Sequence, residues 1–344
     1  MKKETLAQVI IIIVLSIVLG LLLLRLFDSR NNMMFNPIEE KTEKETKKED
    51  VDKGSNVNAK TINLADYNTN INITEAGEYT ITGSFEHSVL VDSDEKVTIN
   101  LDNVNIDSKV NAAIANINTG ELVINIRKGT TNTLKDGGSS ELDGCIYSSG
   151  KLVIQGEGKL SVYGTQEEGE GIATTDNDIT INGGEIYIES ADDGLNAGGD
   201  NGGVITINGG NITIKASGDG IDSNKNLIIN GGKVYTIGSS IGGDAGIDTD
   251  GSFEINGGEV IALGSDMLQN PDKNSKQKYV SFTLNSKISS GTKVSLKDAK
   301  GNEIISFTAN EDFKTIILSN SKISKGTYYM YFDDNKSEYN KTLK

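Results

Sequence analysis

Between Gly169 and Gly264 one phrase recurs four times, as ITINGG at 179–184, ITINGG at 205–210, LIINGG at 227–232 and FEINGG at 253–258. A second phrase alternates with it, as EGIAT at 170–174, DGLNA at 193–197, DGIDS at 219–223 and AGIDT at 245–249. Self-similarity at steps of 22 to 26 residues is typical of a solenoid, because each coil buries its apolar face only by stacking on its neighbours. The repeat therefore predicts stacked coils.

Aliphatic residues occupy alternate positions of the repeats and form three aligned sets. The first set contains Ile179, Ile205, Leu227 and Phe253, and the second contains Ile186, Ile212, Val234 and Val260. The third contains Ile172, Leu195, Ile221 and Ile247. Since side chains alternate between the two faces of a strand, these sets should face inward. We predict an all-β fold, a right-handed three-sided parallel β-helix. The Asn and Gly residues of INGG are expected at a corner, where stacked amides bond from coil to coil.

Composition divides the rest of the chain. The apolar run from Leu6 to Leu24 predicts a cytoplasmic start and transmembrane helix at 1–27. A mixed-charge stalk, disordered for lack of apolar residues, is predicted at 28–59. The β-helix is predicted at 60–268, a linker at 269–278, and at 279–344 an antiparallel β module that covers the open end of the coil. We expect a single-pass cell-membrane protein with an extracellular C-terminal domain, or, as the alternative, secretion after signal cleavage.

The charge of the chain is acidic and uneven. The net charge is −16, and residues 61–344 carry 23 Lys and Arg against 40 Asp and Glu. Such a surface repels nucleic acid, so no nucleic-acid partner is expected. Cys145 and His87 are each the only residue of their type, which excludes an intramolecular disulfide and a Cys/His metal site.

Acidic residues recur in register with the second phrase and are the candidate metal ligands. They are expected at the other corner of the coil, here called the acidic corner, and are Asp192, Asp193, Asn196, Asp219, Asp222, Asp244, Asp248 and Asp250. Because stacked coils lie about 4.8 Å apart, Asp193 should neighbour Asp219, and Asn196 should neighbour Asp222. Carboxylates at that spacing repel one another unless a cation neutralises them, and Ca²⁺ prefers such oxygen ligands. The alternative is that each Asp caps its own turn in a solvated loop.

An enzyme is the competing class of function. The adjacent acids Asp192 and Asp193 resemble the paired carboxylates of glycoside hydrolysis. A polysaccharide lyase would need a base near calcium, for which Lys215 and Lys225 are the candidates, although solvated surface lysines are the simpler interpretation. The position of His87, well before the clear repeats, argues against a histidine-dependent hydrolase. We therefore predict that the protein is not an enzyme.

Several phrases, in order, resemble one known family. They are EAGEYTITGSF at 75–85, RKGTTNTLKDG at 127–137, ADDGLNA at 191–197, ITINGG followed by ASGDGIDSN within 205–224, and GIDTDGSFEINGGEVIALGSDMLQ at 246–269. The chain resembles the calcium- and polysaccharide-binding β-helix proteins called carbohydrate-binding domain-containing proteins, which are related in fold to pectate lyases. The resemblance implies a non-catalytic, calcium-containing solenoid outside a bacterial cell that holds cellulose or polygalacturonate. The resemblance also implies calcium at the acidic corner, at Asp192, Asp193, Asp219, Asp222, Asp244 and Asp248.

The sequence thus predicts a cell-surface protein that holds an extracellular polysaccharide, acidic or of plant cell-wall type, with Ca²⁺ at the acidic corner. Because the chain has no Trp, sugar stacking would fall to Tyr187 and Tyr235 on the outer face. One alternative is a structural or adhesion module of the cell envelope with purely structural calcium. The other is a calcium-dependent polysaccharide lyase.

Overall fold

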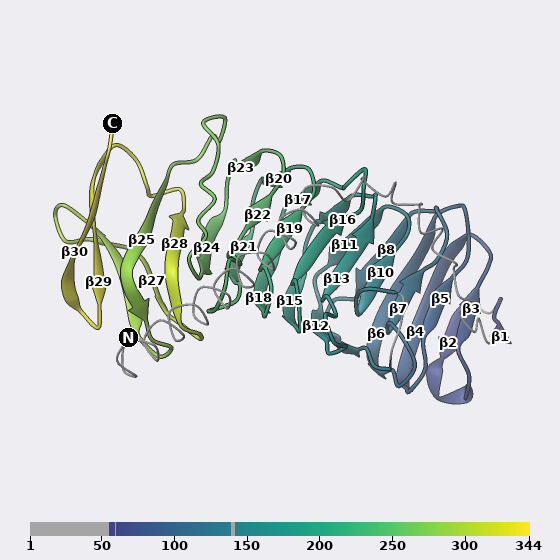
Figure 1. The fold of residues 1–344 in the computed structure, drawn as a ribbon. Helices are drawn as coiled ribbons and strands as arrows, with labels where there is room; N and C mark the ends of the chain where they lie inside the picture. The colour runs from purple at the N-terminus through teal and green to yellow at the C-terminus, as the bar shows by residue number, and fades with distance from the viewer. Residues whose placement is uncertain (1–54, 59, 139–141) are drawn as a thin grey trace, which may run out of the picture. The chain divides into compact units, whose positions relative to one another are not determined.

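The computed structural model describes residues 55–58, 60–138 and 142–344 (Figure 1). The predicted transmembrane helix lies outside these residues, as does nearly all of the predicted stalk. None of the helices in the described ranges has the length and apolar character needed to cross a membrane. Near the start of the described chain, η1 (Leu64–Asp66) is a short 3-10 helix.

The first of three ladders of parallel strands forms a sheet of its own. In spatial order it contains β1 (Ser55–Asn56), β3 (Ile71–Ile73), β5 (Val89–Val91), β7 (Ile114–Asn116), β10 (Ile146–Ser148), β13 (Ile172–Thr175), β16 (Leu195–Gly198), β19 (Ile221–Ser223) and β22 (Asp248–Thr249). Each strand comes from the next coil along the chain, and all pairings are parallel.

The second and third ladders share their first strands and so belong to one sheet. The second ladder contains β2 (Thr61–Asn63), β4 (Gly77–Phe85), β6 (Val97–Asp107), β8 (Leu122–Ile126), β11 (Leu152–Gly156), β14 (Ile179–Ile181), β17 (Ile205–Ile207), β20 (Leu227–Ile229) and β23 (Phe253–Ile255). The third continues from the far halves of β4 and β6 through β9 (Thr131–Lys135), β12 (Lys159–Gly164), β15 (Glu185–Ser190), β18 (Asn211–Ala216), β21 (Lys233–Ile237) and β24 (Glu259–Gly264). The fold is therefore an all-β parallel solenoid, as predicted; its right-handed turn stays a prediction.

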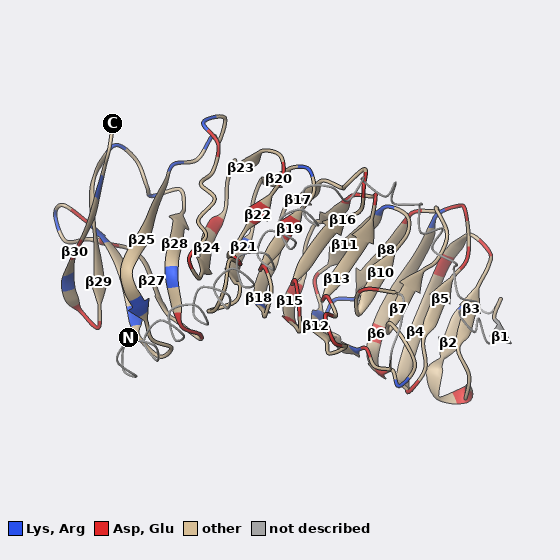
Figure 2. Cartoon of the chain, in the orientation of Figure 1, with Lys and Arg blue, Asp and Glu red and all other residues tan. Residues whose placement is uncertain are grey.

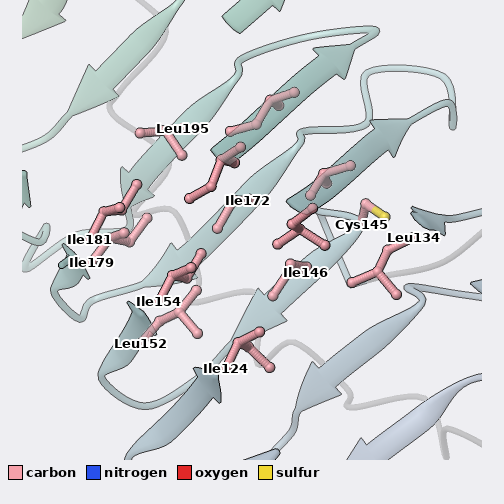
Figure 3. Close-up of a cluster of buried hydrophobic side chains, with 14 of the residues drawn as sticks. Ile124, Leu134, Cys145, Ile146, Leu152, Ile154, Ile172, Ile179, Ile181 and Leu195 are labelled. Atoms are coloured by element: carbon pink, nitrogen blue, oxygen red, sulfur yellow. The ribbon is translucent and has the colours of Figure 1, made fainter. Parts of the chain in front are cut away.

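The three aliphatic sets stack in the predicted register. Ile179 pairs with Ile205 and Ile205 with Leu227, while Ile172 pairs with Leu195 on the first ladder. These five side chains are fully buried, and Figure 3 shows such residues pointing into the space between the ladders. Each buried aliphatic side chain contributes roughly 1.5–3 kcal/mol, so the stacked sets supply the main stabilisation of the coils.

The predicted asparagine ladder is also present. Asn208 Nδ2 donates to Asn182 Oδ1 and Asn230 Nδ2 donates to Asn208 Oδ1, both at 2.9 Å, and Asn256 extends the row at 3.2 Å. Gly184, in the same corner, has a φ of 105°, a conformation that favours glycine. The INGG phrase therefore turns the chain and ties neighbouring coils together.

The last coil is covered by the C-terminal part of the chain. Strand β28 (Phe313–Ser319) pairs antiparallel with β24 and with β25 (Tyr279–Ile288), which extends the third ladder. Residues 265–278, here called the closing segment, bind the other two ladders: Gln269 donates to the Thr249 carbonyl at 2.7 Å, and Asp272 accepts from the Phe253 N–H at 3.1 Å. The segment predicted as a linker thus makes contacts of the kind that a further coil would make.

An antiparallel sheet completes the chain, in the order β27 (Glu303–Thr308), β26 (Lys293–Asp298), β29 (Gly326–Phe332) and β30 (Asn335–Leu343). Together with β25 and β28 it encloses a second hydrophobic core around Leu296, Phe313 and Met330. Ile261 of β24 also belongs to this core, although it faces out of the solenoid. The antiparallel sheet predicted near the C-terminus is therefore confirmed.

Candidate functional site

The acidic residues form two columns that run from coil to coil. The first column contains Glu170, Asp193 and Asp219, because the amide of Gly171 donates to the Asp193 carbonyl at 2.9 Å and that of Gly194 to the Asp219 carbonyl at 3.0 Å. In the second column, Asn196 pairs with Asp222 and Asp222 with Asp248. Six of these side chains therefore lie along one corner at the spacing of stacked coils.

Two aspartates of the first column bind the backbone of the next coil. Asp193 Oδ1 accepts from the Asp219 N–H at 2.7 Å, and Asp219 Oδ1 accepts from the Ala245 N–H. Asp193 Oδ2 also accepts from Asn196 Nδ2 at 3.0 Å. This geometry matches part of the capping alternative, with the difference that each aspartate caps a neighbouring coil and not its own turn.

A cavity of about 280 Å³ opens beside the columns. Its polar lining includes Asp143, Glu170, Asn196 and Asp222. Ala173 occupies the second column between Tyr147 and Asn196, and its small side chain leaves room between these two longer ones. The cavity is thus a polar recess with three carboxyl groups in its lining, those of Asp143, Glu170 and Asp222.

Two of these acids, Glu170 and Asp143, were not among the predicted ligands. Glu170 is only 7% exposed, and its place in EGIAT corresponds to that of Asp193 in DGLNA, a signal that the repeat alignment already contains. Asp143 lies in DGCIY, a more divergent version of the same phrase. The repeat alignment alone could have identified Glu170 as a candidate ligand. Asp143 could be identified only from the strand pairing of Ile146 with Ile172.

Burial raises the pKa of several acids at this corner. It raises the pKa of Asp193 and of Asp219 to about 7 and that of Asp222 to about 6, with neighbouring carboxylates adding to the effect. Glu170 is shifted furthest, to a pKa of about 10, mainly by burial and then by Asp143. Negative charge at this corner is therefore costly unless something compensates it.

The remaining predicted ligands, Asp192, Asp244, Asp248 and Asp250, do not line the cavity. Burial and then Asp244 raise the pKa of Asp192. Asp248 Oδ1 accepts from the Thr249 N–H at 2.9 Å, and exposed Asp250 donates its N–H to the Ser223 carbonyl at 3.0 Å. In the described part of the chain, no three side chains of Asp, Glu, His or Cys are arranged so that they could hold a metal ion as they stand.

One of the predicted sugar-binding tyrosines, Tyr187, contacts a second tyrosine that lines a groove on the third ladder. The ring centroids of Tyr163 and Tyr187 are 6.0 Å apart with an interplanar angle of 58°, and both side chains are half-buried. Tyr187 Oη donates to Glu189 at 2.9 Å. The groove beside them has a volume of about 640 Å³ and is lined by Tyr163, Thr133, Lys135, Thr165, Glu189 and Ala191, among others. The last residue of its lining is Ala191, which directly precedes Asp192 of the acidic corner.

Tyr235, the other predicted sugar-binding residue, packs against the C-terminal module. Its ring meets Phe307 edge-on at 5.8 Å, and its hydroxyl donates to Asn310 Oδ1 at 2.7 Å. Both contacts come from residues more than 70 positions later in the chain. The predicted place of Tyr235 on the outer face of the solenoid therefore did not indicate them. The tyrosine that contacts Tyr187 is Tyr163, which lines the groove.

The family model of the carbohydrate-binding domain-containing proteins matches residues 67–308. The chain belongs to this family. A carbohydrate-binding domain-containing protein of Acetivibrio thermocellus is 32% identical over 131 residues, which are 35% of this chain and 45% of the relative. The chain thus spans a little under half of the relative's length. A solved structure of the polysaccharide lyase-like protein from C. thermocellum, a gadolinium derivative, covers 65% of this chain and 92% of its own, with 26% identity and a TM-score of 0.44.

The two lysines considered as lyase bases lie in different settings. Lys215 Nζ is 2.9 Å from Glu311 and 3.4 Å from Glu189. The hydrogen bond to Glu311 is the largest cause of its raised pKa, which keeps the ammonium protonated and makes it a poor base. Lys225 is exposed, and its N–H donates to Ser223 Oγ at 3.3 Å.

Proposed function

We propose that the chain is a non-catalytic, cell-surface carbohydrate-binding protein that holds an extracellular polysaccharide, acidic or of plant cell-wall type, in the groove beside Tyr163 and Tyr187. The observation that carries the proposal is this pair of half-buried tyrosines, of which Tyr163 lines a groove of about 640 Å³ and Tyr187 contacts Tyr163, in a chain of this family. The cell-surface location rests on the apolar run and charged stalk of the sequence.

The groove offers the contacts that a sugar chain needs. An aromatic ring presents an apolar face to the C–H groups of a pyranose, while hydroxyl, amide and charged groups fix its orientation. Thr133 and Asn105 line the groove as hydrogen-bonding groups. Lys135 Nζ is 3.8 Å from Asp107, and this pair offers one donor and one acceptor of opposite charge on the same wall.

Calcium at the acidic corner is the second part of the proposal. The corner fits calcium by the chemistry of its donors, since carboxylate and amide oxygens are the ligands that calcium prefers. Asp143, Glu170, Asn196 and Asp222, which share the cavity, would hold it, and Asp193 adjoins them. When bound, the cation would supply positive charge that compensates the buried carboxylates. The carboxylates must draw together to do so, because the described residues hold no ready-made cluster.

Binding of the full-length chain to insoluble and soluble polysaccharides tests the first part. Replacing both Tyr163 and Tyr187 by Ala should weaken binding by about tenfold, since each stacking contact is worth roughly 0.5–1.5 kcal/mol. Tyr331→Ala, on the C-terminal sheet, is the matched control and should leave binding unchanged. Absence of binding to every polysaccharide tried, or equal binding by the double variant, would overturn the proposal.

A structural role for calcium is the second candidate, and one observation favours it. Asp193 and Asp219 each bind the backbone of the next coil, so a cation there would strengthen the stacking of coils without touching a ligand. In that case chelation lowers the melting temperature and leaves polysaccharide binding intact. For the lyase alternative, release of unsaturated oligosaccharide from pectate, followed by ultraviolet absorption, is the decisive assay.

A further inference from the structure

A second groove, far from the tyrosine pair in sequence, lies between the closing segment and β30. It has a volume of about 630 Å³. Its lining includes Lys273, Lys278, Lys341, Asp272, Gln277 and Tyr279. The three lysines are exposed, and they come from two separate parts of the chain, 265–278 and β30. Three ammonium groups therefore border one groove.

These lysines differ from most lysines of the solenoid in having no acidic partner. Lys159, Lys215 and Lys233 each lie within 4 Å of a carboxylate. Within the ranges that the structure describes, no ion pair includes Lys273, Lys278 or Lys341. Asp272 is the acid of the lining, and its Oδ2 already accepts the Phe253 N–H. The positive charge of the groove is thus largely uncompensated.

The C-terminal part of the sequence, which contains these lysines, also has more basic than acidic residues. Residues 61–264 carry 10 Lys and Arg against 31 Asp and Glu, whereas residues 265–344 carry 13 Lys against 9 Asp and Glu. Figure 2 shows red segments along the solenoid and blue ones recurring on β25 to β30. Long-range attraction would therefore bring an anion to this end of the chain and repel it from the coils.

We propose that this groove binds an anionic glycan chain directly, through its own carboxylate or phosphodiester groups and without a bridging cation. Lys273 and Lys278 on one side and Lys341 on the other would contact successive anionic groups, because lysines from two elements span more of a polymer than of a small ion. Tyr279, half-buried with its hydroxyl donating to the Pro271 carbonyl at 3.1 Å, would lie beneath a sugar ring. This site is separate from the groove of the proposed function and does not rest on it.

Affinity electrophoresis of the full-length chain in chelator tests the proposal, with polygalacturonate in one gel and poly(glycerol phosphate) in another to distinguish carboxylate from phosphodiester recognition. The triple variant Lys273→Gln, Lys278→Gln, Lys341→Gln should bind about tenfold more weakly than the wild type. Lys300→Gln, Lys322→Gln, Lys325→Gln is the matched control, with the same loss of charge at exposed lysines outside the groove, and should lose less than about twofold.

Supporting results are selective loss in the groove variant and loss of wild-type retardation in about 1 M salt, where the Debye length is about 3 Å. Equal loss in the two triple variants would assign the effect to net charge and overturn the proposal. So would a wild-type chain that neither polymer retards. Poly(glycerol phosphate), which offers the tyrosine groove no sugar ring, should retard the Tyr163→Ala, Tyr187→Ala variant as strongly as the wild type, so a failure of the proposed function is distinguishable from a failure of this site.

Discussion

The solenoid and the C-terminal region after it place the same residue types in opposite settings. In the coils, acids outnumber basic residues by 21, and aspartates such as Asp222 have a raised pKa because burial and neighbouring carboxylates disfavour their charge. In residues 265–344, lysines outnumber acids by 4, and Asp334 has a lowered pKa because Lys293 donates to it. At the acidic corner the stacked coils set like charges beside one another, whereas Lys293 and Asp334 of the C-terminal region set opposite charges side by side.

The largest effect is expected from placing a charge inside the coils. Ile205→Asp should lower the free energy of unfolding by about 5 kcal/mol or more, because an unpaired carboxylate would replace a fully buried side chain. Thr206→Asp, on the outer face of the same strand, is the control and should cost about 1 kcal/mol or less. Chemical denaturation followed by circular dichroism measures both. Similar losses for the two variants would contradict the inward and outward assignment.

The pH dependence of stability should separate the two regions. With chelator present, stability of the solenoid should be full below about pH 4 and fall as pH rises through the pKa of about 6 of Asp222 and of about 7 of Asp193, since a raised pKa favours the protonated folded form. The total loss by about pH 8 should be on the order of 3 kcal/mol, after allowance for coupling between the groups.

Three comparisons check this pH prediction in thermal melts. Asp193→Asn should flatten the dependence, while Asp334→Asn in the module should not. Added Ca²⁺ should restore stability at pH 8 if the proposed site holds it. A stability that rises with pH across this window in chelator would mean that the acidic corner is not under electrostatic strain.

The asparagine ladder should contribute less to the free energy of unfolding than the buried aliphatic side chains do. Asn230→Ala removes the bond that Asn230 donates to Asn208 and the one that it accepts from Asn256, so a loss of about 1–2 kcal/mol is expected. Asn211→Ala, on the outer edge of β18, is a control of the same type. Denaturant titration that finds no difference between the two would show that the corner amides are satisfied equally well by water.

The smallest effect is expected where the two regions meet through charge. Lys215 of the solenoid pairs with Glu311 beyond β27, and both side chains are partly exposed. Lys215→Gln should therefore change the free energy of unfolding by less than about 1 kcal/mol, and 1 M salt should remove most of the difference. A loss of several kcal/mol would make this pair a principal link between coil and module and would weaken the view that β24 and β28 join them.

The repeats allowed much of the fold to be predicted. The inward positions of Ile179 and Ile205, the row of Asn182 and Asn208, and the alignment of Asn196 with Asp222 all follow from a fixed period, since a solenoid places each residue beside its equivalent one coil away. Glu170 could have been added from the same alignment. The closing contacts of Asp272 and Gln269 could not, because the segment that makes them has no counterpart in the repeats.

The sequence by itself determined which side chains stack, because periodic aliphatic and asparagine positions leave one register in which the core is buried and the corner amides meet. Only the tertiary structure decided which of the stacked residues remain available to a ligand. Tyr187 contacts the groove residues Tyr163 and Glu189 while Tyr235 packs on Phe307, and Lys273 and Lys341 line one groove from positions 68 residues apart. Such proximity depends on where the non-repeating end of the chain folds back, and no period in the sequence encodes that.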